Sequence, residues 1–403
     1  VTMKAKTKAT VISLLSTIGF FGIFSTTISK NPVLPLFMKS MNAGTDVIGL
    51  IAAISPLAGI LFSFPVGLLA DRLGKKRLLT AAAFVFLLAP IFYLFVASPW
   101  WIIPIRFFHG IATAILGPVS AAIILSEYKE KKGQMLGIYS SATLVGRTLA
   151  PILGGAIISL FAALLGGWNF RLVYVAAFIL AIPVFILSFL MPDDREGESG
   201  VKKVTLADFG SSLSGFVRNG RLLGTALVEM ATYFTYGAFE TYLPLYLQEK
   251  GLPPYQIGFI FSLQILAIAL TKPFFGRLSD SIDRRVQILV GIVVLGGSFA
   301  LIPIIAGIAA ATAIGIVFGI GLSFSTVATS TYVSDVAAKE SLGASIGALS
   351  SIMDIGQSAG PFIIGAVIQA SSMTTGFLAD FVVCLVCALL FVILNFPRKK
   401  RAA

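Results

Sequence analysis

The sequence is poor in the residues that carry most enzyme and metal chemistry. Its 403 residues include one histidine and two cysteines, and only 12% are charged. It contains no phosphate-binding glycine loop, no cluster of metal-ligating side chains and no nucleophile with a credible base. Cys384 and Cys387 share one apolar run with no histidine nearby, which favours packing over zinc binding or disulfide cycling. We therefore expect a protein that is not an enzyme and that uses no metal or cofactor.

Apolar residues dominate the chain instead. Hydrophobic residues make up 57% of it and the mean hydropathy is +0.94, which is too apolar for a soluble domain. The apolar runs are long enough to cross about 30 Å of hydrocarbon as helices, and they lack the short alternating segments of a β-barrel. Twelve runs are predicted, near residues 10–38, 46–70, 77–98, 100–126, 133–161, 169–191, 222–248, 255–280, 285–308, 310–337, 342–370 and 375–396. We predict an all-α membrane protein with twelve transmembrane helices in the lipid bilayer.

The net charge of +12 does not indicate a nucleic-acid partner, because the basic residues gather on one side of the predicted membrane protein. Twenty-three of the 30 Lys and Arg residues fall in the termini and in the loops after even-numbered helices. The opposite loops hold three: Lys39, Arg171 and Lys250. Four lie inside predicted helices: Lys30, Arg106, Arg147 and Lys272. This positive-inside pattern places both termini in the cytoplasm. We expect a monomeric, multi-pass protein of a prokaryotic cell membrane.

The two halves of the sequence repeat one another. Residues 34–76 match a stretch about 209 positions later, and a second stretch that begins at Gly137 matches at a shift of 210. We predict two pseudo-symmetric six-helix bundles, residues 1–191 and 222–403, joined by a cytoplasmic linker at 192–221. Parallel repeats of this kind place a small-molecule substrate between the halves near the membrane midplane.

A charged loop closes the second predicted helix and carries a family resemblance. The run Gly67-Leu68-Leu69-Ala70-Asp71-Arg72-Leu73-Gly74-Lys75-Lys76 fits the pattern G-x-L-A-D-R-x-G-R/K-K/R at every defined position, and its second copy at 276–285 is partly degraded. The run resembles the loop of the major facilitator superfamily, which implies the major facilitator fold. The resemblance also implies a conformational latch, formed by Gly67, Asp71, Arg72, Gly74, Lys75, Lys76 and Asp280. A loop that serves topology alone is the alternative.

The fifth predicted helix resembles an antiporter signature of the same superfamily, G-x8-G-x3-G-P-x2-G-G, with Ala150 in place of one glycine. Small residues let helix backbones approach, and a proline inside a helix removes one hydrogen bond so that the helix can bend. The eleventh helix repeats the layout. The resemblance implies a helix-bending motif of Gly137, Gly146, Pro151, Gly154, Gly155, Gly356, Gly360 and Pro361. Ordinary packing of small residues is the alternative.

Two shorter motifs resemble the twelve-helix branch of drug and proton antiporters. Asn31-Pro32-Val33-Leu34-Pro35 is similar to its P-V-x-P signature. Arg106-Phe107-Phe108-His109-Gly110 is similar to its R-x-x-Q-G pattern, with His109 in place of Gln. The resemblance links Arg106 to proton movement. His109, one helical turn away, either relays protons or is a neutral side chain that is hydrogen-bonded within the bundle.

Three acidic residues lie in the interior of predicted helices of the second half: Glu229, Glu240 and Asp354. Ionisable side chains inside a membrane are costly and mark ion or proton pathways. Glu229 lies at the depth of Lys272, and Glu240 at the depth of Lys30, so each pair either forms a structural salt bridge or takes part in coupling. The proton-coupling candidates are therefore Glu229, Glu240, Asp354, His109 and Arg106.

Aromatic and polar residues at the depth of the family's central cavity are candidates for binding the substrate. The candidates are Phe20, Phe24, Asn31, Arg147, Tyr233, Tyr236, Gln264 and Lys272. Core or lipid contact is the alternative for the aromatic ones.

The resemblance implies a proton-coupled antiporter that exports small apolar or amphipathic compounds by rocker-switch alternating access. Two further hypotheses stay open. The first is a proton-coupled or facilitative importer of a sugar, organic anion or other metabolite, with Arg106, Arg147 and Lys272 available for an anion. The second is a membrane receptor or scaffold that transports nothing.

Overall fold

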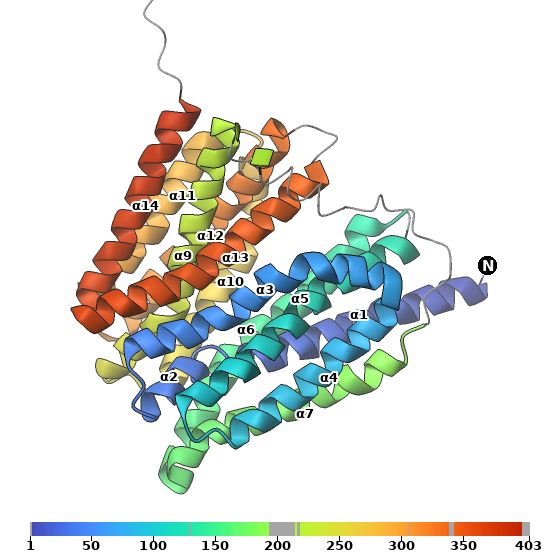
Figure 1. Cartoon of the computed structure of the whole chain (residues 1–403), viewed down its shortest axis with the longest axis horizontal. Coiled ribbons are helices and arrows are strands. Elements are labelled where there is room, and N and C mark those ends of the chain that lie inside the picture. Colours follow the sequence, from blue (N-terminus) through green and yellow to red (C-terminus); the bar gives the residue numbers. More distant parts are fainter. Residues whose placement is uncertain are drawn as a thin grey trace, which may run out of the picture. The chain divides into compact units, whose positions relative to one another are not determined.

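The structure is a computed structural model, and every regular element in its described part is helical (Figure 1). It describes residues 2–128, 130–192, 214–215, 218–304, 306–337 and 342–396, with side chains except at 2–9, 63–65, 67–72, 165, 167 and 342–344. The first-half helices are α1 (Thr2–Ile28), α2 (Val33–Ser40), α3 (Thr45–Leu73), α4 (Lys75–Leu94), α5 (Ile102–Glu127), α6 (Lys132–Leu165) and α7 (Asn169–Phe189). The second-half helices are α9 (Gly220–Glu249), α10 (Pro254–Leu278), α11 (Arg284–Ala300), α12 (Gly307–Val336), α13 (Leu342–Ala370) and α14 (Met373–Asn395). Short 3-10 turns lie at Pro99–Trp101, Gly166–Trp168 and Ile302–Ile304.

The predicted all-α membrane protein with twelve helices is confirmed, with one difference in the first run. That run, predicted as residues 10–38, is two helices, α1 and α2, separated by a turn at residues 29–32. Among the described residues, ten spans are long and apolar enough to cross a membrane. The helices α9 and α11 are not among them. Helix α11 has only 17 residues, and α9 carries two buried glutamates, Glu229 and Glu240.

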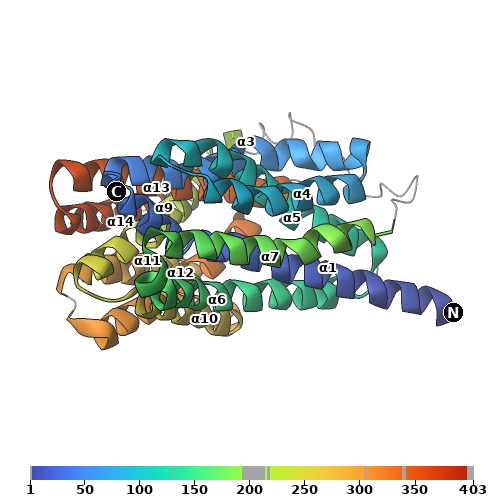
Figure 2. The same cartoon turned by 90° about the horizontal axis from the view of Figure 1, so that it is seen from below.

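The chain divides into two compact units. Unit 1 comprises Val1–Lys202 and Pro244–Ser262. Within it, α1 packs against α6 and α7, α3 against α5, and α4 against α5 and α7; Figure 2 shows α3, α4 and α5 as neighbours. Its interior is apolar, with Leu15, Leu79 and Phe86 fully buried. The predicted linker at 192–221 stays a prediction, because residues 193–213 and 216–217 lie outside the described part.

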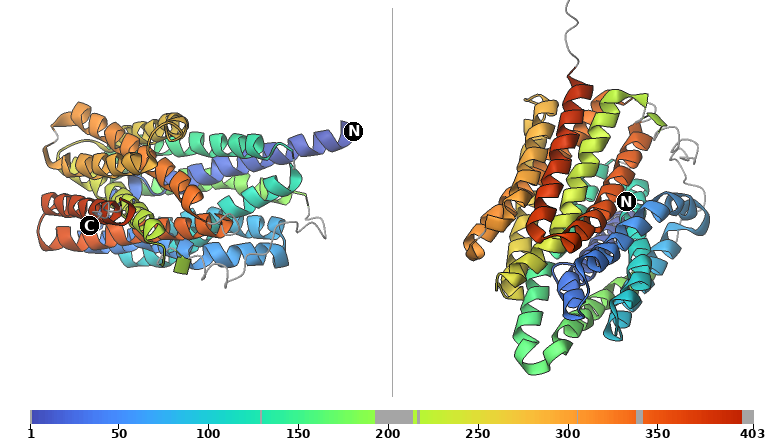
Figure 3. Two further views of the ribbon diagram at one scale, coloured as in Figure 1. Left: turned by 90° about the horizontal axis from the view of Figure 1, so that it is seen from above. Right: turned by 60° about the vertical axis from the view of Figure 1, so that its left-hand side comes forward.

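Unit 2 comprises Lys203–Leu243 and Leu263–Ala403. Its α11 packs between α12 and α14, and Figure 3 shows α14 alongside its neighbours in this unit. Phe239 and Phe318 stack inside it with ring centroids 3.7 Å apart, and Phe299 packs on Phe377 at 4.7 Å. Each unit therefore has a core of its own.

The two units repeat one backbone contact. In unit 1 a Cβ atom on Gly146 of α6 would lie 2.6 Å from the backbone oxygen of Phe20 on α1. In unit 2 a Cβ atom on Gly356 of α13 would meet the backbone oxygen of Met230 on α9 at a forbidden distance. Both residues of the second pair lie 210 positions after those of the first. The sequence repeat is therefore a repeat of helix packing.

The other residues of the helix-bending motif divide into two groups. Gly154, Gly155 and Gly360 also lie against neighbouring chain segments, and Gly360 faces the backbone oxygen of Phe234. A Cβ atom on Gly137 would meet no described atom within 4 Å, so this glycine does not take part in the close packing. Pro151 and Pro361 lie inside helices that continue on both sides of them. Helix bending itself stays a prediction.

Candidate functional site

A cavity within unit 2 brings together two of the ionisable residues that the sequence singled out. It has a volume of about 360 Å³ and is called the unit 2 cavity below. Its lining comes from α9, α10, α12 and α13: Glu229, Tyr233, Lys272, Thr326, Val327, Ser330, Thr331, Ile346, Leu349, Ser350 and Met353. Glu229 and Lys272 are the charged members of this lining, and hydroxyl groups supply most of its remaining polarity.

Glu229 is held in place by a hydroxyl group from the facing helix. Its side chain is 4% exposed, and its Oε2 accepts a 2.6 Å hydrogen bond from the Oγ1 of Thr329 on α12. A second buried hydrogen bond, 3.2 Å between the hydroxyls of Thr232 and Ser325, joins the same two helices nearby. The carboxyl group therefore has a fixed position at the cavity wall, which a proton carrier needs.

Lys272 faces the same cavity from α10 and is exposed. Its ammonium group is close enough to act electrostatically on Glu229. The expected meeting of these two residues is thus present in the structure, while the direct salt bridge between them stays a prediction. A carboxylate and an ammonium group on one cavity wall compensate each other's charge. Protonation of Glu229 therefore leaves the positive charge of Lys272 uncompensated.

The other two acidic candidates lie elsewhere in unit 2. Glu240 is buried on α9, three helical turns from Glu229, with 6% of its surface exposed. Asp354 is half-buried on α13, next to the cavity residue Met353. Neither residue lines the unit 2 cavity, so their roles in coupling stay predictions.

A fourth acidic residue inside a helix was missed by the sequence analysis. Asp380 on α14 is fully buried, and its Oδ2 accepts a 2.7 Å hydrogen bond from the Oγ1 of Thr235 on α9. The same hydroxyl lies 3.1 Å from the Sγ of Cys384, which places this cysteine in a packed interior. The sequence signal for Asp380 is an acidic residue within the apolar run 375–396. It was not singled out because it lies near the start of that run.

The hydroxyl groups around Glu229 were also missed. The α12 segment Ser323-Phe324-Ser325-Thr326-Val327-Ala328-Thr329-Ser330-Thr331 carries six hydroxyl side chains within an apolar helix. Thr329 contacts Glu229, and Thr326, Ser330 and Thr331 line the unit 2 cavity. A run of hydroxyls in a transmembrane helix was therefore the signal that could have identified α12 as a cavity helix.

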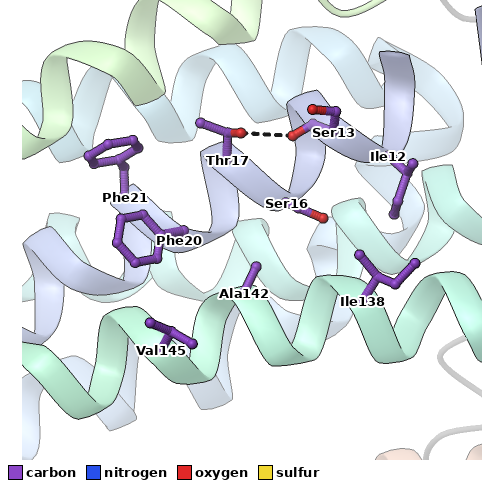
Figure 4. Close-up of a pocket in the computed structure, with 9 residues that line it drawn as sticks. All are labelled: Ile12, Ser13, Ser16, Thr17, Phe20, Phe21, Ile138, Ala142 and Val145. Carbon is purple, nitrogen blue, oxygen red and sulfur yellow. Dashed lines mark hydrogen bonds between the residues drawn. The ribbon is translucent and has the colours of Figure 1, made fainter. Parts of the chain in front are cut away.

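A pocket within unit 1 has a different character. It has a volume of about 620 Å³ and lies between α1 and α6, lined by Ile12, Ser13, Ser16, Thr17, Phe20, Phe21, Ile138, Ala142 and Val145. Figure 4 shows Phe20 and Phe21 side by side at one end, where the ring centroids are 4.9 Å apart. The hydroxyl of Thr17 donates to the backbone oxygen of Ser13, as the dashed line shows (Figure 4). No charged residue lines this pocket, so the pocket is suited to contact with apolar groups.

Three of the predicted substrate-binding residues line the unit 1 pocket or the unit 2 cavity. Phe20 lines the unit 1 pocket, and Tyr233 and Lys272 line the unit 2 cavity. The others line neither. Phe24 packs on Phe20 at 5.6 Å, and Tyr236 on Tyr233 at 6.0 Å. The remaining three are the buried Asn31, the exposed Arg147 and the buried Gln264. A binding role for these residues stays a prediction.

Arg106 and His109 lie in the packed interior of unit 1, with 2% and 1% of their surfaces exposed. The ring of His109 meets the ring of Phe86 edge-on, 5.4 Å between centroids. Neither residue lines the unit 1 pocket. The proposed proton relay through them is untested.

The latch residues of the first half are described only in part. Gly74 joins α3 to α4 with a φ of 89°, a conformation that favours glycine. The Nζ of Lys75 donates to the Oγ of Ser126 at the end of α5, at 3.2 Å. The side chains of Asp71 and Arg72, and the surroundings of Gly67, lie outside the described residues.

The second copy of the latch forms a charged cluster within unit 2. Asp280 lies 3.5 Å from Arg284, which also pairs with Asp335 at the end of α12. Asp283 caps α11 by accepting a 2.9 Å hydrogen bond from the backbone N–H of Arg285. The Arg285 side chain, which also donates to Asp283, holds the pKa of that carboxyl below its usual range. The copy is degraded in sequence but still ties α10, α11 and α12 together.

Long apolar helices in two units that repeat a backbone contact, with ionisable residues on a cavity wall, are typical of a membrane transporter built from parallel repeats. A family model described as Major Facilitator Superfamily matches residues 12–257 and 225–403. The chain belongs to the Major Facilitator Superfamily and is a multi-pass transporter of small molecules, as the loop motif predicted. This family and fold are those of transporters and not of enzymes.

Individual relatives agree with this assignment. An uncharacterized MFS-type transporter of the archaeon Methanocaldococcus jannaschii is 24% identical over 87% of this chain and 86% of its own length. A homologue of the multi-drug resistance efflux pump PmrA from Lactococcus lactis is 24% identical over the same shares. Among solved structures, a bacterial homologue of the human lysosomal transporter Spinster superposes with a TM-score of 0.78, at 15% identity, covering 96% of this chain and 97% of the other. That likeness shows the fold.

Proposed function

We propose that the chain is a proton-coupled antiporter that exports small, largely apolar or amphipathic compounds, and that Glu229 carries the proton. The observation that carries this proposal is a buried carboxyl group at the wall of the unit 2 cavity, fixed by Thr329 and facing Lys272. A carboxylate is expensive inside a membrane helix and persists there when it serves an ion or proton pathway.

Glu229 is preferred over the other acidic candidates because of access. A proton carrier must reach the cavity that opens alternately to the two sides of the membrane. Glu229 lines the unit 2 cavity, whereas Glu240 and Asp354 are not part of its lining. Lys272 also lowers the cost of the charged state by its opposite charge, so both protonation states of the site are within reach.

Export of apolar compounds is supported by two observations of different kinds. The unit 1 pocket is lined by aromatic and aliphatic side chains with a few hydroxyls, which suits apolar compounds without strong directional demands. The relative from Lactococcus lactis is named for multidrug efflux. Alternating access by a rocker-switch motion of the two repeats follows from the general behaviour of such folds.

The position of Lys272 favours a second candidate function, proton-coupled import of an organic anion. When Glu229 takes up a proton, Lys272 loses its compensating charge and becomes a binding group for a carboxylate. Proton and anion then bind together and move in the same direction. Arg106, also available for such an anion, is buried and does not line the unit 1 pocket, so its part in anion binding stays a prediction.

Purified protein in liposomes with an internal pH-sensitive dye separates the two functions. A panel of apolar, cationic and anionic compounds is added outside without a pH gradient, and the internal pH is recorded. Antiport of apolar or cationic compounds makes the lumen lose protons as substrate enters. Import with an anion makes the lumen acidic. No proton movement with any transported compound would contradict proton coupling.

A further inference from the structure

A buried positive charge inside unit 1 has no acidic partner in the described part of the chain. Arg106 on α5 is 2% exposed. The ion pairs formed by described carboxylates are with other basic residues, and none includes Arg106. A guanidinium group withdrawn from water and from lipid headgroups needs a compensating negative charge or a set of strong acceptors. Among the described residues, the helices around Arg106 supply no carboxylate that pairs with it.

The groups around Arg106 are hydroxyl and imidazole groups, and the hydroxyl oxygen of Tyr93 accepts a hydrogen bond from the guanidinium. Tyr93 on α4 and Tyr174 on α7 are both fully buried, and their rings stack with centroids 4.2 Å apart and planes 5° from parallel. The guanidinium acts electrostatically on both tyrosines and on His109, which follows it by one helical turn. These four side chains come from three helices that pack against one another, α4, α5 and α7.

Polar atoms of three of these side chains lack hydrogen-bond partners among the described residues. These atoms are the Nε of Arg106, the hydroxyl oxygen of Tyr174 and both ring nitrogens of His109. The Nε–H group and each tyrosine hydroxyl can donate, and a neutral imidazole adds one further N–H. Buried polar groups in proteins are nearly always satisfied by a protein atom, by water or by an ion. Several donors beside one uncompensated positive charge match the needs of an anion.

We propose that Arg106, Tyr93, Tyr174 and His109 form a binding site for a small monovalent inorganic anion, of which chloride is the probe of choice. A bound anion compensates the guanidinium charge and accepts hydrogen bonds from the tyrosines. Water would satisfy the hydrogen bonds and leave the charge uncompensated. The site lies among α4, α5 and α7, away from the lining of the unit 1 pocket between α1 and α6. It is therefore distinct from that pocket and from the unit 2 cavity, and it joins three helices of unit 1.

The test is the unfolding temperature of the purified full-length protein in detergent, measured as chloride replaces gluconate at constant ionic strength. The unfolding temperature should rise with chloride to saturation, and bromide should act in the same way. Tyr174→Phe keeps the stacked ring and removes one donor, so the half-saturating chloride concentration should rise about tenfold. Arg106→Gln should abolish the dependence on chloride.

Tyr332→Phe is the matched control. Its hydroxyl donates to the side chain of Asn395 in unit 2 at 2.8 Å, so its loss removes one tyrosine hydroxyl far from Arg106 in sequence and outside unit 1. The half-saturating chloride concentration should be that of the wild type. If Arg106→Gln does not fold, Tyr93→Phe joins Tyr174→Phe in its place. Equal unfolding temperatures in chloride and gluconate would overturn the proposal in favour of water. An unchanged half-saturation in Tyr174→Phe would place the anion elsewhere.

Discussion

The carboxyl group of Glu229 on α9 accepts a 2.6 Å hydrogen bond from the hydroxyl of Thr329 on α12. This contact joins a buried ionisable group to the helix that supplies most hydroxyls of the unit 2 cavity. It also fixes the carboxyl group where Lys272 acts on it. The account of coupling given above depends on this arrangement, and each of its parts can be changed separately.

Thr329→Val should weaken coupling without removing the carboxyl group. The valine keeps the size of the side chain and deletes the hydrogen bond that orients Glu229. We expect proton-coupled flux to fall about three- to tenfold, the effect of losing one hydrogen bond to an acidic group. Thr326→Val is the control, because the Thr326 hydroxyl donates to the backbone oxygen of Leu322 and not to Glu229. Equal losses in the two variants would mean that the hydrogen bond has no special role.

Lys272→Gln should change stability in a way that depends on Glu229. The single variant leaves the carboxyl group without the nearby positive charge, whereas the double variant with Glu229→Gln removes both charges. A double-mutant cycle of unfolding free energies in detergent should give a coupling of about 1 kcal/mol, because Lys272 is exposed and partly screened. Strict additivity would show that the two residues act independently.

Gly146→Ala and Gly356→Ala should both impair transport, because each methyl group meets a backbone oxygen of the facing helix and forces the helices apart. We expect at least about a fivefold loss of flux in each, since such small-residue contacts set the distance between membrane helices. Gly137→Ala is the control from the same motif, and it has open space around it. Transport and the amount of protein in the membrane are measured together. If Gly137→Ala impaired transport as much as Gly146→Ala, close helix packing would not explain the role of this motif.

Asp71→Asn should slow transport several-fold while the protein still inserts, as the loop motif implies for a latch. Its counterpart in the second copy should matter less. Asp280 is largely exposed, and Arg284 keeps its pair with Asp335 when Asp280 is changed. Initial rates of the two Asn variants, normalised to the amount of protein in liposomes, provide the comparison. Wild-type rates in Asp71→Asn would remove the latch role.

The sequence was sufficient for the fold because the signals for a membrane fold are long. Twelve apolar runs and a repeat of about 210 residues specify the helices and their duplication, and the contacts of Gly146 and Gly356 follow that repeat. The break between α1 and α2 was not predicted, because the apolar run continues through it.

The site was predicted less completely, because helical position does not say which neighbour a side chain meets. Glu229 and Lys272 were paired by depth, and both line the unit 2 cavity, but their salt bridge stays a prediction. Arg106 was expected to contribute to binding or coupling; its side chain is buried beside Tyr93 and Tyr174, and that role stays a prediction. Asp380 was overlooked because it stands near a helix end in sequence, although α9 and α14 bury it completely.

The most direct test of the central claim compares wild-type protein with Glu229→Gln and Glu249→Gln in liposomes with an imposed pH gradient. Glu249 is the matched control, since it is an exposed glutamate at the end of the same helix, 4.0 Å from Lys39. Uptake driven by the pH gradient should fall at least about tenfold in Glu229→Gln, while exchange of substrate for substrate, which needs no net proton movement, persists. Glu249→Gln should behave as the wild type in both assays. Gradient-driven uptake that survives intact in Glu229→Gln would contradict the account.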